Sequence, residues 1–266
     1  MIGTVAQLVT LAAYGNAYLR IGYINEDYDQ SNSTFQFCKR IHFKELLDGK
    51  PSSKSLAESP SAWFRYLRER NCQCLRLYYD LENIKNNQRT AGLINSAGTW
   101  YLEALYSDHS DFWLADWQVG DQKAEDQKVW LVDYILVAPN KTSINLQFRP
   151  EDVRKELNEV LPEIAAFASS QKLQNWVAVF LAAKDTLTKE NPEADYYHKD
   201  LLPEQYYWLE YQQLIFAAGT AWVFGAMGSW NDLIFDDPKT EKQYNELSAK
   251  LYKAIIKTII AAVNTG

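Results

Sequence analysis

The chain has 266 residues, of which 47% are hydrophobic and 23% charged, and it carries a formal net charge of −7. This composition is typical of a folded globular protein and excludes an intrinsically disordered chain. The negative charge disfavours nucleic-acid binding, which requires cations placed against phosphates, so no nucleic-acid partner is expected.

The N-terminal segment, MIGTVAQLVTLAAYGNAYLR, is mildly apolar, but it has no basic start and polar residues interrupt its apolar run. We therefore predict no signal peptide, and no membrane-spanning helix because the chain lacks a run of about 18 apolar residues. Three cysteines, Cys38, Cys72 and Cys74, are an odd number and indicate free thiols in a reducing compartment. The expected location is the cytoplasm, with no membrane partner.

Strand patterns dominate the first half of the chain. Alternation and strand-forming residues favour strands at 18–24, 34–43 and 72–81. The Ser59–Pro60 pair predicts the start of a short helix, SAWFRYLRER. The polar stretch 83–96 is interpreted as a loop.

A three-strand antiparallel meander is the clearest β pattern. Residues 99–106 and 112–119 alternate between apolar and polar side chains, and residues 129–137 are almost wholly apolar. Short polar connections join the three segments. Because both faces of the third segment are apolar, we predict that it is a central strand.

Helical periodicity takes over after Pro150, where an apolar stripe begins. Pro162 is expected to divide this run into two helices or to kink it. Further helices are predicted at 171–188 and 204–224, and the Asp237–Pro238 pair is a cap and first turn for a final helix.

Strands followed by helices indicate an α+β fold. We expect an antiparallel β-sheet in the N-terminal half, packed against a C-terminal set of α-helices. The expected unit is a single domain over residues 1–266, sheet-rich over 1–140 and helical over 150–266.

Familiar catalytic and cofactor-binding motifs are absent from the sequence. There is no phosphate-binding loop, glycine-rich dinucleotide motif, HExxH pair or GxSxG elbow. The three histidines, His42, His109 and His198, have no spacing that suits a metal site. We therefore predict no cofactor and no metal, and we assign no catalytic residue.

Asp133 is the strongest candidate for an acid–base role. It lies within VWLVDYILV, where every neighbour is apolar, and a buried carboxylate must be paired or must have a raised pKa. One interpretation is a small-molecule hydrolase or transferase that uses Asp133, with Asp116 or Glu103 nearby. The other is a structural aspartate that is satisfied by a backbone amide, a tyrosine or an arginine.

A glycine-punctuated loop, AWVFGAMGSWND, occupies residues 221–232. Gly225 and Gly228 permit a tight turn, while Trp230 either fills the core or joins Asp232 in contacting a ligand or a protein. The string resembles one in bacterial immunity-type proteins, the cognate partners of polymorphic toxins, whose usual form is close to FGGMGSWND. The resemblance covers only these 12 residues, with Ala226 in place of a glycine. It implies a cytoplasmic inhibitor that binds one toxin and performs no catalysis.

Acidic and aromatic loops agree with this implication. An acidic inhibitor is steered onto a basic nuclease and mimics phosphates, and aromatic side chains anchor a tight complex. Our main hypothesis is an immunity protein that occludes the active site of a cognate toxin, with a basic nuclease preferred. The alternatives are the enzyme described above and a non-catalytic scaffold protein. The candidate contact residues are Asp108, Asp111, Asp121, Glu125, Asp126, Glu193, Asp195, Trp230 and Asp232.

Overall fold

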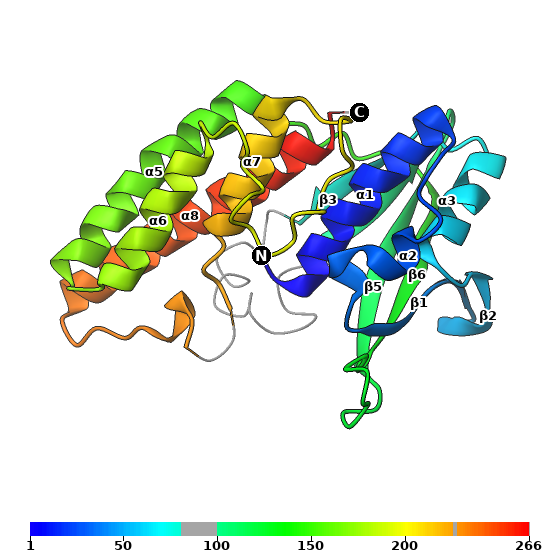
Figure 1. The fold of residues 1–266 in the computed structure, drawn as a ribbon, viewed down its shortest axis with the longest axis horizontal. Coiled ribbons are helices and arrows are strands. Elements are labelled where there is room, and N and C mark those ends of the chain that lie inside the picture. The colour runs from blue at the N-terminus through cyan, green and yellow to red at the C-terminus, as the bar shows by residue number, and fades with distance from the viewer. Residues whose placement is uncertain (81–99, 226–227, 266) are drawn as a thin grey trace.

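The computed structural model describes residues 1–80, 100–225 and 228–265. Figure 1 shows a sheet beside a helical bundle, with α1 lying along the sheet. The elements are α1 (Gly3–Ile21), α2 (Tyr28–Ser31), η1 (Ser33–Phe35), β1 (Cys38–Leu47), β2 (Lys50–Ala57), α3 (Pro60–Glu69), β3 (Cys74–Tyr79), β4 (Trp100–Leu105), β5 (Ser110–Val119), β6 (Trp130–Lys141), α5 (Pro150–Ser170), α6 (Gln174–Thr186), α7 (Leu209–Thr220), η3 (Trp230–Asp232) and α8 (Pro238–Val263).

Six strands form one sheet within the described residues, in the order β2-β1-β6-β5-β4-β3. The strands β4, β5 and β6 pair antiparallel, which confirms the meander, and β6 lies centrally between β5 and β1. The β1–β6 pair is parallel, whereas the other four pairs are antiparallel. The fold is α+β, as expected, with one parallel pair that the periodicity did not indicate.

The prediction of a strand at 18–24 is wrong, because most of these residues belong to the end of α1. The helix ends at Gly22, whose φ of 74° lies in the left-handed region. α1 contacts α3 and α8 as well as β3 and β4. A helix enclosed in this way needs no polar stripe, so its 3.6-residue period is missing from the sequence.

The start of β1 also differs from the expectation. Residues 33–35 form a short 3-10 helix instead, in which the Asn32 side chain accepts a hydrogen bond from the Thr34 amide. β1 continues through Leu47 into a hairpin with β2, which was not expected. Asp48 and Gly49 occupy the turn with φ values of 50° and 75°. An Asp-Gly pair is a recognised hairpin signal, so β2 was predictable in principle.

The helical half is closer to its prediction. Asp237 caps α8 by accepting a hydrogen bond from the Thr240 amide at 2.8 Å, as expected. Pro162 does not divide its run, since α5 is one helix from Pro150 to Ser170. The buried side chains on both sides of Pro162, Leu161 and Ile164, hold that helix against its neighbours. The loop predicted at 83–96 lies outside the described residues.

Two asparagine side chains complete the outer edge of β3. Asn16 on α1 accepts from the Leu75 amide at 2.6 Å and donates to the Leu75 carbonyl at 2.9 Å. Asn264, which follows α8, makes the same pair of bonds with Leu77 at 2.7 and 2.9 Å. An edge strand otherwise exposes unpaired backbone groups to other chains. All four bonds protect the edge, and those of Asn264 also connect the helical half to the sheet.

Gly15 on α1 gives a test of this packing. A Cβ atom there would lie 2.3 Å from Leu75 Cδ1 and 3.0 Å from Phe64 Cε1, and both side chains are fully buried. Although alanine favours a helix, we expect Gly15→Ala to lower the free energy of unfolding by about 1–2 kcal/mol, because overpacking outweighs propensity. Urea denaturation measures this change. Gly3→Ala in the same helix is the control, since its Cβ meets only Trp117 at 3.9 Å. A stabilised Gly15→Ala protein would contradict the tight fit.

Candidate binding surface

Asp133 lies in a charged cluster on the sheet. Its Oδ2 atom accepts a hydrogen bond from Lys44 Nζ at 2.8 Å and lies 3.3 Å from a terminal nitrogen of Arg40. Both cations are on β1, the parallel neighbour of β6. The side chains of Asp133 and Lys44 are only 7% and 12% exposed. Oδ2 is therefore satisfied as the structural interpretation expects, with a lysine as the nearest partner, whereas Oδ1 is buried and has no hydrogen-bond partner among the described residues.

The other carboxylates considered for this cluster do not form an acid–base pair with Asp133. Asp116 is its direct cross-strand neighbour on β5, but the Asp116 carboxylate accepts from Gln118 at 2.7 Å. Glu103 is opposite Phe112 instead and accepts from Ser110 Oγ at 2.6 Å. Burial, followed by the charge of nearby Arg40, lowers the pKa of His42 beside the cluster.

Trp230 lies in the core of the helical half. It is 0% exposed, and its indole nitrogen donates to Ser248 Oγ at 2.7 Å. Its indole packs edge-on against the rings of Phe167, Trp176 and Phe180. Of the two interpretations of this residue, the structure supports the core one, and the ring offers no surface to a partner. Asp232 is exposed, and its carboxylate accepts from the Gly228 amide within the same turn.

The acidic candidates near β5 fall at its two ends. Asp108 and Asp111 lie at the start of the strand: Asp108 bonds His109, which lowers the pKa of the Asp108 carboxyl, and Asp111 accepts from the Asn140 amide. The exposed residues Asp121, Glu125 and Asp126 lie beyond the other end, in the β5–β6 connection. These five carboxylates therefore do not form one surface. The connection itself also contains two lysines, at 123 and 128, which offset its charge.

A second group of acidic residues lies on two segments that are distant in the sequence and meet at Asp200 and around one pocket. Segments 21–32 and 189–211, here called the acidic face, contain nine acidic residues and two lysines. Asn32 donates to the Asp200 carbonyl at 2.9 Å, and the Ser33 amide donates to the Asp200 carboxylate at 2.6 Å. His198 Nδ1 lies 2.8 Å from Ser33 Oγ, and burial lowers the pKa of His198.

Two of the predicted contact residues belong to the acidic face. Asp195 is exposed, and its bond with Lys189, at 2.8 Å, lowers its pKa, while Glu193 is half-buried. The predicted contact residues included none from the first segment, although it contains Glu26, Asp27 and Asp29 and no lysine or arginine. No local pattern shows that this segment contacts a loop more than 160 residues away.

Exposed aromatic side chains accompany these acids. Tyr23, Tyr197 and Trp208 are 64%, 68% and 78% exposed. A large aromatic ring that is exposed to water in the free protein gives up no packing contacts when a partner covers it. Such rings are frequent anchors of interfaces. The two segments of the acidic face thus carry both negative charge and exposed rings.

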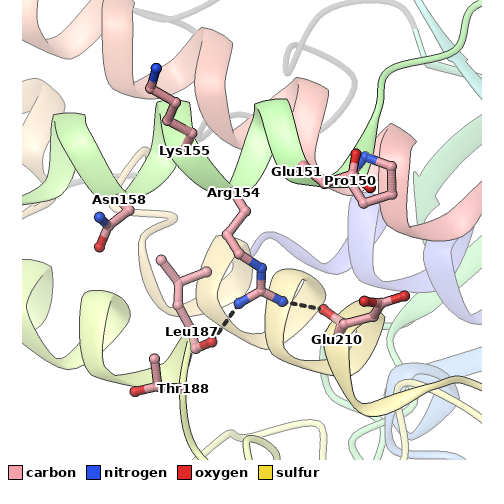
Figure 2. A pocket seen from close by; sticks show the side chains of 8 residues that line it. All are labelled: Pro150, Glu151, Arg154, Lys155, Asn158, Leu187, Thr188 and Glu210. Carbon is pink, nitrogen blue, oxygen red and sulfur yellow. Dashed lines mark hydrogen bonds between the residues drawn. The ribbon is translucent and has the colours of Figure 1, made fainter.

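A separate pocket of about 450 Å³ lies between α5, the end of α6 and the start of α7. Figure 2 shows Arg154 extending from α5 and donating to the carbonyls of Leu187 and Glu210, at 2.5 and 2.8 Å. Lys155 and Glu151 also line this pocket. Because the Arg154 guanidinium is occupied by backbone carbonyls, its main role is to join the three helices.

Comparisons with protein-family models, with curated proteins and with solved structures gave no match. Among the described residues, no helix is both long and apolar enough to cross a membrane. The same residues contain no group of three histidine, cysteine or acidic side chains arranged to hold a metal ion.

Proposed function

We propose that this chain is a cytoplasmic immunity protein that binds a cognate toxin through the acidic face and blocks its active site. The observation that supports this most is the presence of Tyr23, Tyr197 and Trp208, all exposed, on segments with nine acids and two lysines. Negative potential accelerates association with a basic protein, and rings supply contact area at its centre. A nuclease is the preferred toxin, since nucleases carry basic surfaces for phosphate.

Other features are consistent with a binding role in a reducing compartment. All three cysteines, Cys38, Cys72 and Cys74, are free thiols. The pKa of each thiol is raised, chiefly by burial, which disfavours the reactive thiolate. Asp133 is engaged in ion pairs, so the strongest acid–base candidate already has a structural role.

The test compares two charge-reversed variants with equal changes in net charge. One carries Glu26→Lys, Asp195→Lys and Glu204→Lys on the acidic face; the other carries Asp121→Lys, Glu125→Lys and Asp126→Lys on the β5–β6 connection. All six side chains are exposed, so both variants should fold. Association with the protein encoded beside this chain is followed at low salt, together with survival of cells that express both.

We expect the acidic-face variant to associate about tenfold or more slowly and to lose protection, because steering depends on local potential. The second variant should change association by less than about threefold. Equal slowing by both variants would contradict the assignment of the face. If the unmodified chain neither binds the neighbouring protein nor protects cells from it, the proposed function fails.

A further inference from the structure

A pocket of about 560 Å³ opens within the acidic face, a volume in the range of small-molecule sites. Its walls come from the C-terminal half of α1, the segment 21–32 and the loop 200–206. The hydrogen bonds of Asp200 to Asn32 and Ser33 hold that loop against α2 and η1. The pocket is therefore built by fixed contacts between elements.

Four tyrosines line this pocket: Tyr14, Tyr23, Tyr28 and Tyr206. The rings of Tyr14 and Tyr28 lie 4.6 Å apart between centroids and are tilted by 32°. Tyr28 is only 3% exposed, and its hydroxyl makes no hydrogen bond within the described residues. A buried hydroxyl without a partner is uncommon, but this one is not exposed at the surface of the pocket.

The charged residues that line the pocket are both acidic, although the Arg68 guanidinium of α3 lies against Gly22, between the lining residues Ile21 and Tyr23. Asp200 and Glu204 are among the lining residues, and no lysine, arginine or histidine is. The Ser33 amide donates to one oxygen of the Asp200 carboxylate at 2.6 Å, and the Ser33 hydroxyl donates to the other. Burial raises the pKa of Tyr14, and the charges of Asp200 and Glu204 raise it further. The negative potential of both carboxylates thus extends to the aromatic wall.

We propose that this pocket binds an alkylammonium group. A cation gains from the faces of aromatic rings and from nearby carboxylates, whereas an anion would meet two like charges with no base among the lining residues. The ammonium belongs either to a free small amine or to a lysine side chain of a bound protein. This inference does not depend on the proposed function, because the pocket and its charges exist without a toxin.

Choline and its uncharged isostere 3,3-dimethyl-1-butanol are the probes for the test. The uniformly ¹⁵N-labelled full chain is titrated with each while amide resonances are followed. We expect choline to shift the resonances of segments 14–32 and 200–206 in a saturable way, and the isostere to produce no shifts there at equal concentration. Nα-acetyl-lysine methylamide, titrated in parallel, identifies the source: tighter binding of this compound favours a lysine of a protein, and tighter binding of choline favours a free amine.

Variants connect binding to the pocket. Glu204→Gln should weaken choline binding about three- to tenfold, and Tyr23→Ala about threefold, since one removes a carboxylate and the other a ring face. Glu190→Gln is the matched control: Glu190 is exposed on the same loop but does not line the pocket. The proposal is overturned if the isostere binds as well as choline, if the shifts fall outside the pocket, or if Glu190→Gln weakens binding as much as Glu204→Gln does.

Discussion

Replacing Trp230 by alanine is expected to lower the free energy of unfolding by about 3–5 kcal/mol, the cost of emptying a large core site. The indole is completely buried and packs against Phe167, Trp176 and Phe180 from α5 and α6. The substitution also removes the partner of Ser248 Oγ on α8, leaving a polar group in the core. The loss therefore combines a cavity with an unsatisfied hydroxyl.

Urea denaturation followed by far-ultraviolet circular dichroism measures this loss without relying on tryptophan fluorescence. Trp208→Ala is the matched control, since it deletes the same side chain where 78% of the residue is exposed. We expect the control to change the free energy of unfolding by about 0.5 kcal/mol or less. A Trp230→Ala protein as stable as the Trp208→Ala protein would show that the loop, rather than the core, determines the position of Trp230.

The burial of Trp230 also explains why turn-forming residues surround it in the sequence. Gly228 has a φ of 86°, and its amide donates to the Asp232 carboxylate. Ser229 accepts from the Asn231 amide, which starts the turn of η3. The glycine, serine and aspartate thus shape a turn that inserts the indole between helices. A string that stands out in the sequence can be specified by folding alone, so the resemblance to immunity-type proteins is no reason to expect Trp230 in the interface.

The sequence predicted elements well where one face was buried and the other was not. β4 and β5 of the meander have this alternation, whereas β6 was recognised from its apolar run and the start of α8 from the local cap at Asp237. The prediction failed for α1 because this helix is enclosed by other elements, so its sequence shows no amphipathic 3.6-residue period. Hydrophobic periodicity identifies an element only when one of its faces is buried and the other is exposed.

Long-range pairing was beyond the reach of sequence patterns. The lysine partner of Asp133 depends on the parallel register of β1 and β6, which pairs His42 with Asp133 and brings Lys44 alongside. The acidic face depends on the hydrogen bonds that Asn32 and Ser33 make with Asp200, which lies 168 and 167 positions after them. Individual acids were visible in the sequence, but the placement of Asp200 and Glu204 beside four tyrosines in one pocket was not.

Asp133→Asn is expected to lower the free energy of unfolding by about 3 kcal/mol or more, because it leaves the Lys44 ammonium buried without a counter-ion. Arg40 is less affected, since 36% of its side chain is exposed and it can remain hydrated. Asp116→Asn is the matched control on the opposite strand and should change stability by about 0.5 kcal/mol or less. Urea denaturation provides both values.

A double variant separates two contributions to the loss of stability: the buried charge left without a counter-ion and the lost packing. Asp133→Leu combined with Lys44→Met removes both charges and fills a similar volume, so we expect it to recover most of the loss, to within about 1 kcal/mol of the unmodified chain. If Asp133→Asn alone proves harmless, the ion pairs of this carboxylate are dispensable to the fold, and another reason for burying it is required. A substrate turnover that disappears in that stable variant would then favour the hydrolase or transferase alternative over the binding protein, because the carboxylate would be needed for chemistry and not for folding.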